Sequence, residues 1–327
     1  MSNDRKQLKV VSFGLGPIGL EILKQCHHSK HVCVVGAVDI SPELVGQDIG
    51  ELIGEEASGL AVATSIEELE LPPGTIALHA TGSKLDSVWP QIRQLLNYGL
   101  SVVSTCEELS YPWARYPELA AEMDQYAKQR ELTILGTGIN PGFIMDTLAL
   151  CLSAVTNRIS SIRIFRNVDV SKRRLPLQKK VGVGMAKQTF IELAAKSKIG
   201  HVGLEESVRL VAHGLNLQLT NVRNSIEPKL SPAGDEGVCG LHQTAVGQTK
   251  EGIELYLDLT MAVGVEQSDQ IEILGAETRK LVIPGGIFGD TATASIAINS
   301  SKLIHATKPI GLNTMVDLSL PRNVSLV

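Results

Sequence analysis

Residues 8–19, LKVVSFGLGPIG, constrain the fold most, because an apolar run passes directly into a glycine-rich turn. Residues 8–13 predict a buried parallel strand, and the apolar spacing after Pro17 predicts a helix. A strand, a Gly-x-Gly-x-x-Gly turn and a helix in this order are typical of a dinucleotide-binding site. Pro17 fits the first helical turn, where amides have no intrahelical partner. The free amides and the helix dipole predict an anion site.

Each glycine of this turn has its own predicted task. Gly14 allows the tight turn, Gly16 lets the backbone approach a pyrophosphate, and Gly19 lets the helix pack closely on the strand. The predicted cofactor contacts in the turn are Gly14, Gly16, Pro17, Ile18 and Gly19.

An acidic residue follows the second predicted strand. The apolar residues 31–38 end at Asp39, which lies 20 positions after Gly19. A carboxylate there accepts hydrogen bonds from the adenosine ribose hydroxyls. The alternative is that Asp39 only starts the turn 39–42. Because a carboxylate repels a 2′-phosphate, the sequence favours NAD, without excluding NADP, since Ser41 can soften that repulsion.

Composition limits the other classes of function. The chain has 327 residues, enough for two domains, and a net charge of −5. Its longest basic cluster is 172–174, so neither nucleic acid nor a membrane is expected as a partner. Without an 18-residue apolar run, and with a polar amino terminus, the chain is expected to be soluble and cytoplasmic. Five scattered cysteines without a C-x-x-C pair predict reduced, mostly core thiols and no metal site.

The next strand and helix continue the alternating pattern. Residues 75–80 predict a strand, residues 85–96 an amphipathic helix, and the carboxyl ends of such strands face the cofactor. His79, Thr81 and Gly82 are therefore candidates to line the cofactor path. For His79 the favoured alternative is a hydrogen-bonded core histidine inside an apolar strand.

Two adjacent carboxylates follow the predicted strand 100–104. Glu107 and Glu108 come after Thr105, itself a candidate cofactor contact, where a nicotinamide ring would lie. The alternative is the capping of a short helix, with the carboxylates against its dipole. Because adjacent residues point to different sides, one glutamate can cap while the other faces the cleft as acid or base.

The first domain ends after the predicted strand 132–135. The Gly- and Pro-rich loop that follows contains Asn140, a further candidate cofactor contact, and we place the domain boundary near Asp146.

In the remaining chain the spacing of the apolar residues changes. Residues 160–171 and 252–264 alternate as half-buried strands, 204–213 predict a helix, and 172–180 predict a basic loop. The small-residue helix 291–304 is expected to pack on the nucleotide domain.

The predicted fold is thus α/β, with a doubly wound parallel Rossmann sheet and a second α+β domain that carries a mixed or antiparallel sheet. The predicted segments are a dinucleotide-binding domain at 1–146, a substrate and dimerisation domain at 147–290, and a carboxyl-terminal helix and tail at 291–327 that packs back on the nucleotide domain. The alternation of 252–264 also suggests that the outer face of the second sheet forms a homodimer.

These stretches together resemble one family. FGLGPIG, GAVDI, HATGS, STCEEL, GINPGF, QKKVGVG, IGHVGLEES, GLHQTAVG, GGIFGDTATA and GLNTMVDL span nearly the whole chain. In order and spacing they are similar to the 2,4-diaminopentanoate dehydrogenase and native amine dehydrogenase family, whose fold is related to dihydrodipicolinate reductase. The resemblance implies an oxidoreductase: reversible NAD(P)-dependent oxidative deamination of an amine to a ketone or aldehyde plus ammonia, with reductive amination in reverse.

The resemblance also implies a catalytic glutamate in STCEEL, for which Glu108 is favoured and Glu107 is the second candidate. The substrate pocket should be mainly apolar, and four residues are candidates to line it: Phe143, Met145, Val168 and His201.

Three other functions remain as alternatives. A dihydrodipicolinate reductase should carry a His-His and Lys segment in its second domain, whereas residues 27–30 here close the first helix. An acylating aldehyde dehydrogenase would use Cys106 as its nucleophile. A regulator that senses the nucleotide without turnover would keep the fold, although STCEEL argues against it.

Overall fold

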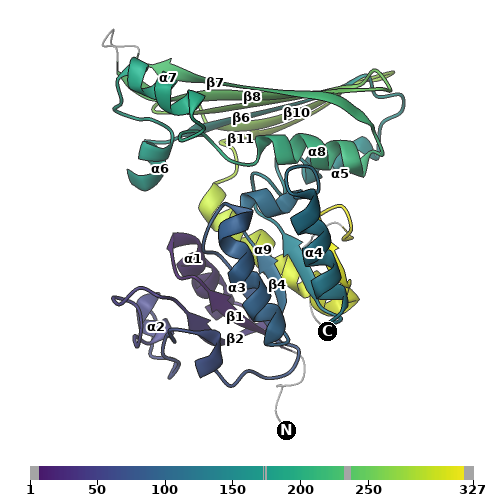
Figure 1. Cartoon of the computed structure of the whole chain (residues 1–327). Helices are drawn as coiled ribbons and strands as arrows, with labels where there is room; N and C mark the ends of the chain where they lie inside the picture. The colour runs from purple at the N-terminus through teal and green to yellow at the C-terminus, as the bar shows by residue number, and fades with distance from the viewer. Residues whose placement is uncertain (1–6, 172, 174, 232–236, 320–327) are drawn as a thin grey trace. The chain divides into compact units, whose positions relative to one another are not determined.

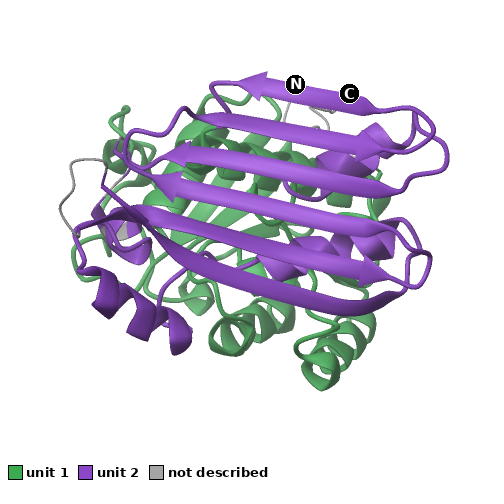
Figure 2. Ribbon diagram, turned by 90° about the horizontal axis from the view of Figure 1, so that it is seen from above, with its two compact units in different colours: residues 1–143, 288–327 green, residues 144–287 purple. Residues whose placement is uncertain are grey.

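The computed structural model describes residues 7–171, 173, 175–231 and 237–319, and the chain separates into two compact units. Unit 1 comprises residues 1–143 and 288–327, and unit 2 comprises residues 144–287 (Figures 1 and 2). The chain therefore passes from unit 1 to unit 2 between Phe143 and Ile144, and returns between Ile287 and Phe288.

Unit 1 is built on a parallel sheet of six strands in the order β12-β5-β4-β3-β1-β2. These strands are β1 (Leu8–Phe13), β2 (Val32–Val38), β3 (Ile76–His79), β4 (Ser101–Ser104), β5 (Thr133–Gly136) and β12 (Gly311–Asn313). The strand order reverses between β1 and β3, which makes this the doubly wound sheet that the sequence predicts.

Helices cover both faces of this sheet (Figure 1). They are α1 (Pro17–His27), α2 (Ile49–Leu52), α3 (Leu85–Asn97), α4 (Pro117–Lys128) and α9 (Gly289–Thr307), with the 3₁₀ turns η2 (Ile66–Glu68) and η3 (Glu107–Ser110). Helix α9 joins α1 through Gln25, whose side chain donates to the Thr291 carbonyl at 2.8 Å and accepts from Ser295 at 2.8 Å. The amphipathic α3 buries Leu85, Ile92 and Leu96, the helical spacing that predicts it.

Unit 2 contains a mixed sheet of six strands in the order β11-β10-β6-β9-β8-β7. Its strands are β6 (Ser161–Asp169), β7 (Leu219–Leu230), β8 (Val238–Thr249), β9 (Glu254–Ala262), β10 (Ser268–Leu274) and β11 (Arg279–Pro284). The pair β6–β9 is parallel and the other pairs are antiparallel, which confirms the predicted mixed sheet.

Helices cover one face of this second sheet. Unit 2 has α5 (Thr147–Ser153), α6 (Leu175–Lys180), α7 (Lys187–Ala195) and α8 (Leu204–Gly214). Helices α5 and α8 pack together on one face, and Figure 2 shows the strands from the opposite face, over which no described helix lies. The expectation of a loop at 172–180 is wrong from Leu175 onward, because α6 is helical; Lys172 and Arg174 lie outside the described residues.

Strand β9 shows the predicted alternation, since Leu255, Leu257 and Leu259 are fully buried while Glu254 and Tyr256 keep partial exposure. On β6 the alternation does not predict the burial of one charged residue. Arg166 lies on the same buried face as Ile164 and Val168 and is only 4 % exposed.

All five cysteines are free thiols, as predicted, but only Cys26 and Cys106 are buried, so the expectation of mostly core positions is wrong. In the part of the chain that the structure describes, no helix combines the length and the apolar character needed to cross a membrane.

Candidate active site

The candidate site lies at the carboxyl edge of the parallel sheet in unit 1. Strands β1, β3 and β4 end next to one another, at Phe13, His79 and Ser104, and the strand order reverses between β1 and β3. In open α/β sheets, ligands bind outside the carboxyl ends of the strands at this reversal. The turns that follow these strands therefore carry the candidate functional groups.

The three glycines of the first turn have different surroundings. Gly14 has a φ of +89°, and a Cβ there would lie 2.6 Å from the Thr81 side chain. A Cβ on Gly19 would lie 1.9 Å from the Gly14 carbonyl oxygen, whereas a Cβ on Gly16 would meet no described atom within 4 Å. The tight turn and the close helix packing are thus as predicted, and the backbone at Gly16 is open to approach. Pro17 is the first residue of α1, after the N-cap Gly16.

Asp39 joins the glycine turn to the end of β2. Its carboxylate accepts a hydrogen bond from the Leu15 amide at 2.5 Å and another from the Ser41 amide at 2.8 Å. The bond from Ser41 is the one expected if Asp39 starts the turn 39–42, which is the alternative role predicted for this residue. Because a carboxylate has about four acceptor sites, two further hydrogen bonds to ribose hydroxyls are compatible with this arrangement.

His79 is a hydrogen-bonded core residue, which confirms the interpretation favoured from the sequence and corrects the other candidate role, in which its side chain lines the cofactor path. Its side chain is 0 % exposed and stacks on Phe13, with ring centroids 5.6 Å apart. Nδ1 pairs with the Ser104 hydroxyl at 2.9 Å, and Nε2 lies 2.8 Å from Gln91 and 2.9 Å from the Thr81 hydroxyl. Burial lowers the pKa of His79 from 6.5 to about 4, so the ring is neutral at pH 7. Thr81 and Gly82, which follow it, are exposed.

Glu108 has both carboxylate oxygens engaged by other groups of unit 1. The side chain is 4 % exposed, and its Oε2 accepts from the Leu85 amide at 2.9 Å and from the Tyr116 hydroxyl at 2.8 Å. Its Oε1 accepts from Arg115 at 3.1 Å. Leu85 is the first residue of α3 and follows Lys84, whose side chain has no acceptor atom to cap a helix. Glu108 therefore caps the start of α3 from 23 positions further along the chain.

Burial, followed by the hydrogen bond to Glu108, raises the pKa of Tyr116 to about 12, so this hydroxyl stays a donor. Tyr116 and Arg115 were not predicted from the sequence as partners of Glu108. Their signal lies in SYPWARY directly after STCEEL, where polar donors follow the paired carboxylates at short range.

Glu107 begins the η3 turn and keeps partial exposure, unlike its neighbour. The two adjacent glutamates thus differ in burial, and one of them caps a helix as predicted, whereas the prediction that the other faces a cleft stays a prediction. The helix capped is α3, however, not a helix beginning at Glu107. Thr105, also partly exposed, donates its amide to the His79 carbonyl at 3.0 Å and places this turn beside β3.

Cys106 does not suit the role of a nucleophile. Its side chain is 0 % exposed, and burial raises the pKa of the thiol to about 12. Because the thiolate is the reactive form, this buried thiol does not support the acylating aldehyde dehydrogenase alternative.

Buried polar atoms also follow β5. Among the described residues, Thr137 Oγ1 and Asn140 Oδ1 are buried without a hydrogen-bond partner. The Thr137 amide donates to the Ser104 carbonyl at 2.9 Å, which places this loop beside the end of β4, and the peptide bond between Asn140 and Pro141 is cis. Buried polar atoms without partners are costly, which makes this loop a candidate to contact a ligand.

The predicted substrate-lining residues divide into two kinds. Met145 is 0 % and Val168 is 3 % exposed, so their side chains offer no surface to a ligand, and this expectation is corrected. Phe143 and His201 keep partial exposure. The main chain of His201 is bound on both sides by Gln243, whose amide oxygen and nitrogen each lie 3.0 Å from it.

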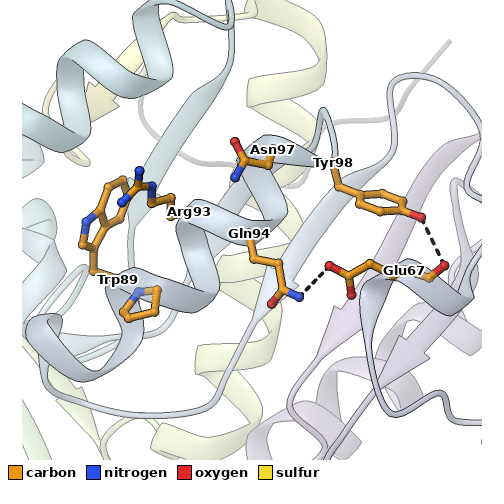
Figure 3. Close-up of a pocket in the computed structure, with 7 residues that line it drawn as sticks. Glu67, Trp89, Arg93, Gln94, Asn97 and Tyr98 are labelled. Atoms are coloured by element: carbon orange, nitrogen blue, oxygen red, sulfur yellow. Dashed lines mark hydrogen bonds between the residues drawn. The ribbon is translucent and has the colours of Figure 1, made fainter.

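A separate pocket of about 340 Å³ lies along α3 (Figure 3). Figure 3 shows Gln94 donating to Glu67, at 2.7 Å, across this pocket. The pocket is lined by Glu67, Trp89, Pro90, Arg93, Gln94, Asn97 and Tyr98. None of these is a residue that the sequence predicts for the active site. The strand ends remain the candidate active site because the open glycine turn and the paired carboxylates lie there.

Comparison with known proteins identifies the family. Residues 143–326 match the family described as the 2,4-diaminopentanoate dehydrogenase C-terminal domain. The chain belongs to the 2,4-diaminopentanoate dehydrogenase family. This match confirms the predicted family and enzyme class, an oxidoreductase of the amine dehydrogenase type.

Individual relatives agree with this assignment. The chain is 27 % identical to 2,4-diaminopentanoate dehydrogenase of Acetoanaerobium sticklandii, over 98 % of this chain and 95 % of that protein. It is 26 % identical to an amine dehydrogenase of Streptomyces virginiae, over 67 % of this chain and 62 % of that protein. The solved structure of an amine dehydrogenase from Mycobacterium smegmatis has the same fold, with a TM-score of 0.86, 24 % identity and 99 % of both chains covered.

Proposed function

We propose that this chain catalyses the NAD-dependent oxidative deamination of a primary amine to a carbonyl compound and ammonia, and the reverse reductive amination. The main support is its membership of the 2,4-diaminopentanoate dehydrogenase family, together with a dinucleotide-type turn and paired carboxylates on one sheet edge. The substrate is a small amine or the matching ketone or aldehyde.

The residues at the sheet edge fit a dinucleotide. The open backbone at Gly16 and the amides of the first turn of α1 suit a pyrophosphate, and Asp39 retains acceptor capacity for ribose hydroxyls. The proposed contacts are Gly14, Gly16, Pro17, Ile18, Gly19, Asp39, Thr81, Gly82, Thr105 and Asn140. A bound nicotinamide would accept hydride from the amine carbon, or donate it in the reverse direction.

Glu107 is the proposed catalytic carboxylate. In the deaminating direction hydride loss leaves an iminium carbon, and Glu107 takes a proton from the water that adds to it. Glu107 then returns the proton to the amino nitrogen and takes the hydroxyl proton of the carbinolamine, so that the C–N bond breaks and ammonia leaves as the carbonyl forms. Partial exposure leaves this side chain accessible to substrate and water.

Glu108, which the sequence analysis favours as the catalytic residue, is proposed instead to position the turn. Its carboxylate already accepts bonds from Leu85, Tyr116 and Arg115. A group that exchanges a proton with the substrate needs an oxygen that the substrate or water can reach, whereas both oxygens of Glu108 are buried against these three donors. Through η3, these bonds hold the backbone that carries Glu107.

Matched variants of Glu107 and Glu108 test this assignment. The assay follows NADH or NADPH formation spectrophotometrically from short amines and diamines, with NAD and NADP compared. Glu107→Gln keeps the size of the side chain but cannot accept the proton, so kcat should fall by about 10²-fold or more. Glu108→Gln should lower the melting temperature and leave a larger kcat than Glu107→Gln. If only Glu108→Gln is inactive while folded, the roles are exchanged, and if both variants turn over normally, the proposed mechanism is wrong.

We also propose a cytoplasmic location, which is in keeping with the five free thiols.

A further proposal is a homodimer formed by the outer face of the second sheet. Phe165 and Tyr256 form a partly exposed aromatic pair on this face, with ring centroids 5.9 Å apart. A partly apolar sheet face suits association with a second copy. Light scattering should give twice the mass of the chain, and Phe165→Glu should shift it toward the monomer. A strict monomer for the parent protein at micromolar concentration would remove this proposal.

A further inference from the structure

Two histidines and a glutamate converge at the far end of α1, on a part of unit 1 that the proposed reaction does not use. His27 is the last residue of α1 and His28 is its C-cap, while Glu55 follows α2. His27 Nε2 lies 3.8 Å from Glu55 Oε2, and His28 Nε2 lies 3.5 Å from Glu55 Oε1. All three ligand atoms lie within 4.8 Å of one another.

These separations suit a coordination shell better than a hydrogen bond. An N–H···O bond is usually about 2.7–3.2 Å long, shorter than either contact. In a tetrahedral zinc site, Zn–N and Zn–O distances of about 2.0–2.2 Å place neighbouring ligand atoms roughly 3.3–3.6 Å apart. The 3.5 Å to Oε1 lies within that range and the 3.8 Å to Oε2 just above it, so a rotation of the Glu55 carboxylate and a small movement of the imidazoles bring all three groups onto one ion.

The backbone on both sides of the cluster is held in place. The His28 amide donates to the Lys24 carbonyl at 3.3 Å, and the Glu55 amide donates to the Gly50 carbonyl at 2.9 Å. Asp48 fixes the loop that carries Glu55 by accepting from the amides of Gly50, Ser58 and Gly59. The hydrogen bond from Ser58, with those of the other amides, lowers the pKa of Asp48 to about 2. The backbone that carries the three ligands is thus held in place before any ion binds.

The surroundings also favour a cation. The cluster sits at the carboxyl end of α1, where the helix dipole is negative. The side chains of His27, His28 and Glu55 are 42 %, 58 % and 34 % exposed, so an ion can reach them and water can complete its coordination.

We propose that His27, His28 and Glu55 form a binding site for a divalent transition-metal ion of the zinc class. Two imidazole nitrogens and one carboxylate are a ligand set that Zn²⁺ accepts with water in the fourth position. The bound ion ties the end of α1 to the segment after α2 and stabilises unit 1, because an ion that binds only the folded state adds to its stability. The site is structural and independent of the proposed dehydrogenase reaction.

Metal titration of the full chain tests this proposal. After removal of metal with a chelator, calorimetry with ZnCl₂ should show one ion per chain, and Co²⁺ should give the visible absorption of a tetrahedral site. Zn²⁺ should also raise the melting temperature. His28→Ala and Glu55→Gln should each weaken Zn²⁺ binding by at least about tenfold, since each removes one of three protein ligands.

Two exposed residues serve as matched controls. His305→Ala removes a histidine from the last turn of another helix, α9, and Glu56→Gln removes the carboxylate next to Glu55. Both controls should bind Zn²⁺ as the parent protein does, and circular dichroism should show that all four variants are folded. The proposal is wrong if the parent binds no Zn²⁺, or if the controls lose as much affinity as His28→Ala and Glu55→Gln.

Discussion

The two sheets of this protein bury polar side chains in different ways. In unit 2, Arg166 on β6 and Asp269 on β10 lie side by side, and their side chains are only 4 % and 3 % exposed. They form an ion pair in which Arg166 Nη1 lies 2.8 Å from Asp269 Oδ1. In unit 1, the buried polar side chains on the sheet are uncharged, and among them is the neutral His79, hydrogen-bonded to Ser104 and Gln91.

The difference follows from what each sheet must hold. The ion pair of unit 2 also binds the backbone where the chain leaves the unit: Asp269 accepts from the Ile287 amide at 2.7 Å, and Arg166 donates to the Ile287 carbonyl at 2.9 Å. The network of unit 1 lies beneath the candidate site, and the carboxylates of that site, on Asp39 and Glu107, keep partial exposure. Charge is thus buried where it anchors the chain and is left accessible where we propose that it meets a ligand.

Breaking the ion pair should have the largest effect on stability. Arg166→Met removes the guanidinium and leaves the Asp269 carboxylate buried without its partner, which should cost about 3–5 kcal/mol. Urea unfolding followed by circular dichroism measures the loss. The double change Arg166→Met with Asp269→Leu should recover much of it, because no unpaired charge remains. Equal losses in the single and double variants would show that the pair is not the source of the effect.

The neutral network should make stability depend on pH. Burial lowers the pKa of His79 from 6.5 to about 4, so protons bind the unfolded chain first as the pH falls. Stability from the neutral ring is complete above pH 6.5 and is lost between pH 6.5 and about 4, with a total of about 3 kcal/mol from this shift.

His79→Gln keeps hydrogen-bonding groups but does not titrate, so its stability should change less over this range. Urea midpoints measured from pH 7 to pH 4 test the difference. If the parent and the variant lose stability in parallel, His79 is not the group responsible.

Changing the partly exposed Asp39 carboxylate should have the smallest effect on stability and a clear effect on cofactor binding. Asp39→Ala removes the bonds to Leu15 and Ser41, worth about 1–3 kcal/mol together because this carboxylate is partly solvated. If Asp39 also binds the ribose, the KM for NAD should rise far more than the KM for NADP. Steady-state kinetics with both cofactors decides, and equal changes would leave Asp39 with a role only in the turn.

Much of unit 1 could be predicted from the sequence because its signals are local. The strand at Leu8–Phe13, the start of α1 at Pro17 and the tasks of Gly14 and Gly19 follow from side-chain period and backbone sterics within a few residues. The mixed sheet of unit 2 was also predictable, since the alternation of Glu254–Ala262 reports which side chains are buried.

The tertiary structure alone decided which polar residues meet one another, because those contacts join distant parts of the chain. Glu108 caps α3 at Leu85, Arg166 pairs with Asp269 across β6 and β10, and Glu55 reaches the histidines at the end of α1. No periodicity marks such pairs, since burial and hydrogen bonding depend on which strands and helices pack together. The sequence by itself determined the elements and the family, whereas the fold decided whether each carboxylate braces the chain or stays accessible.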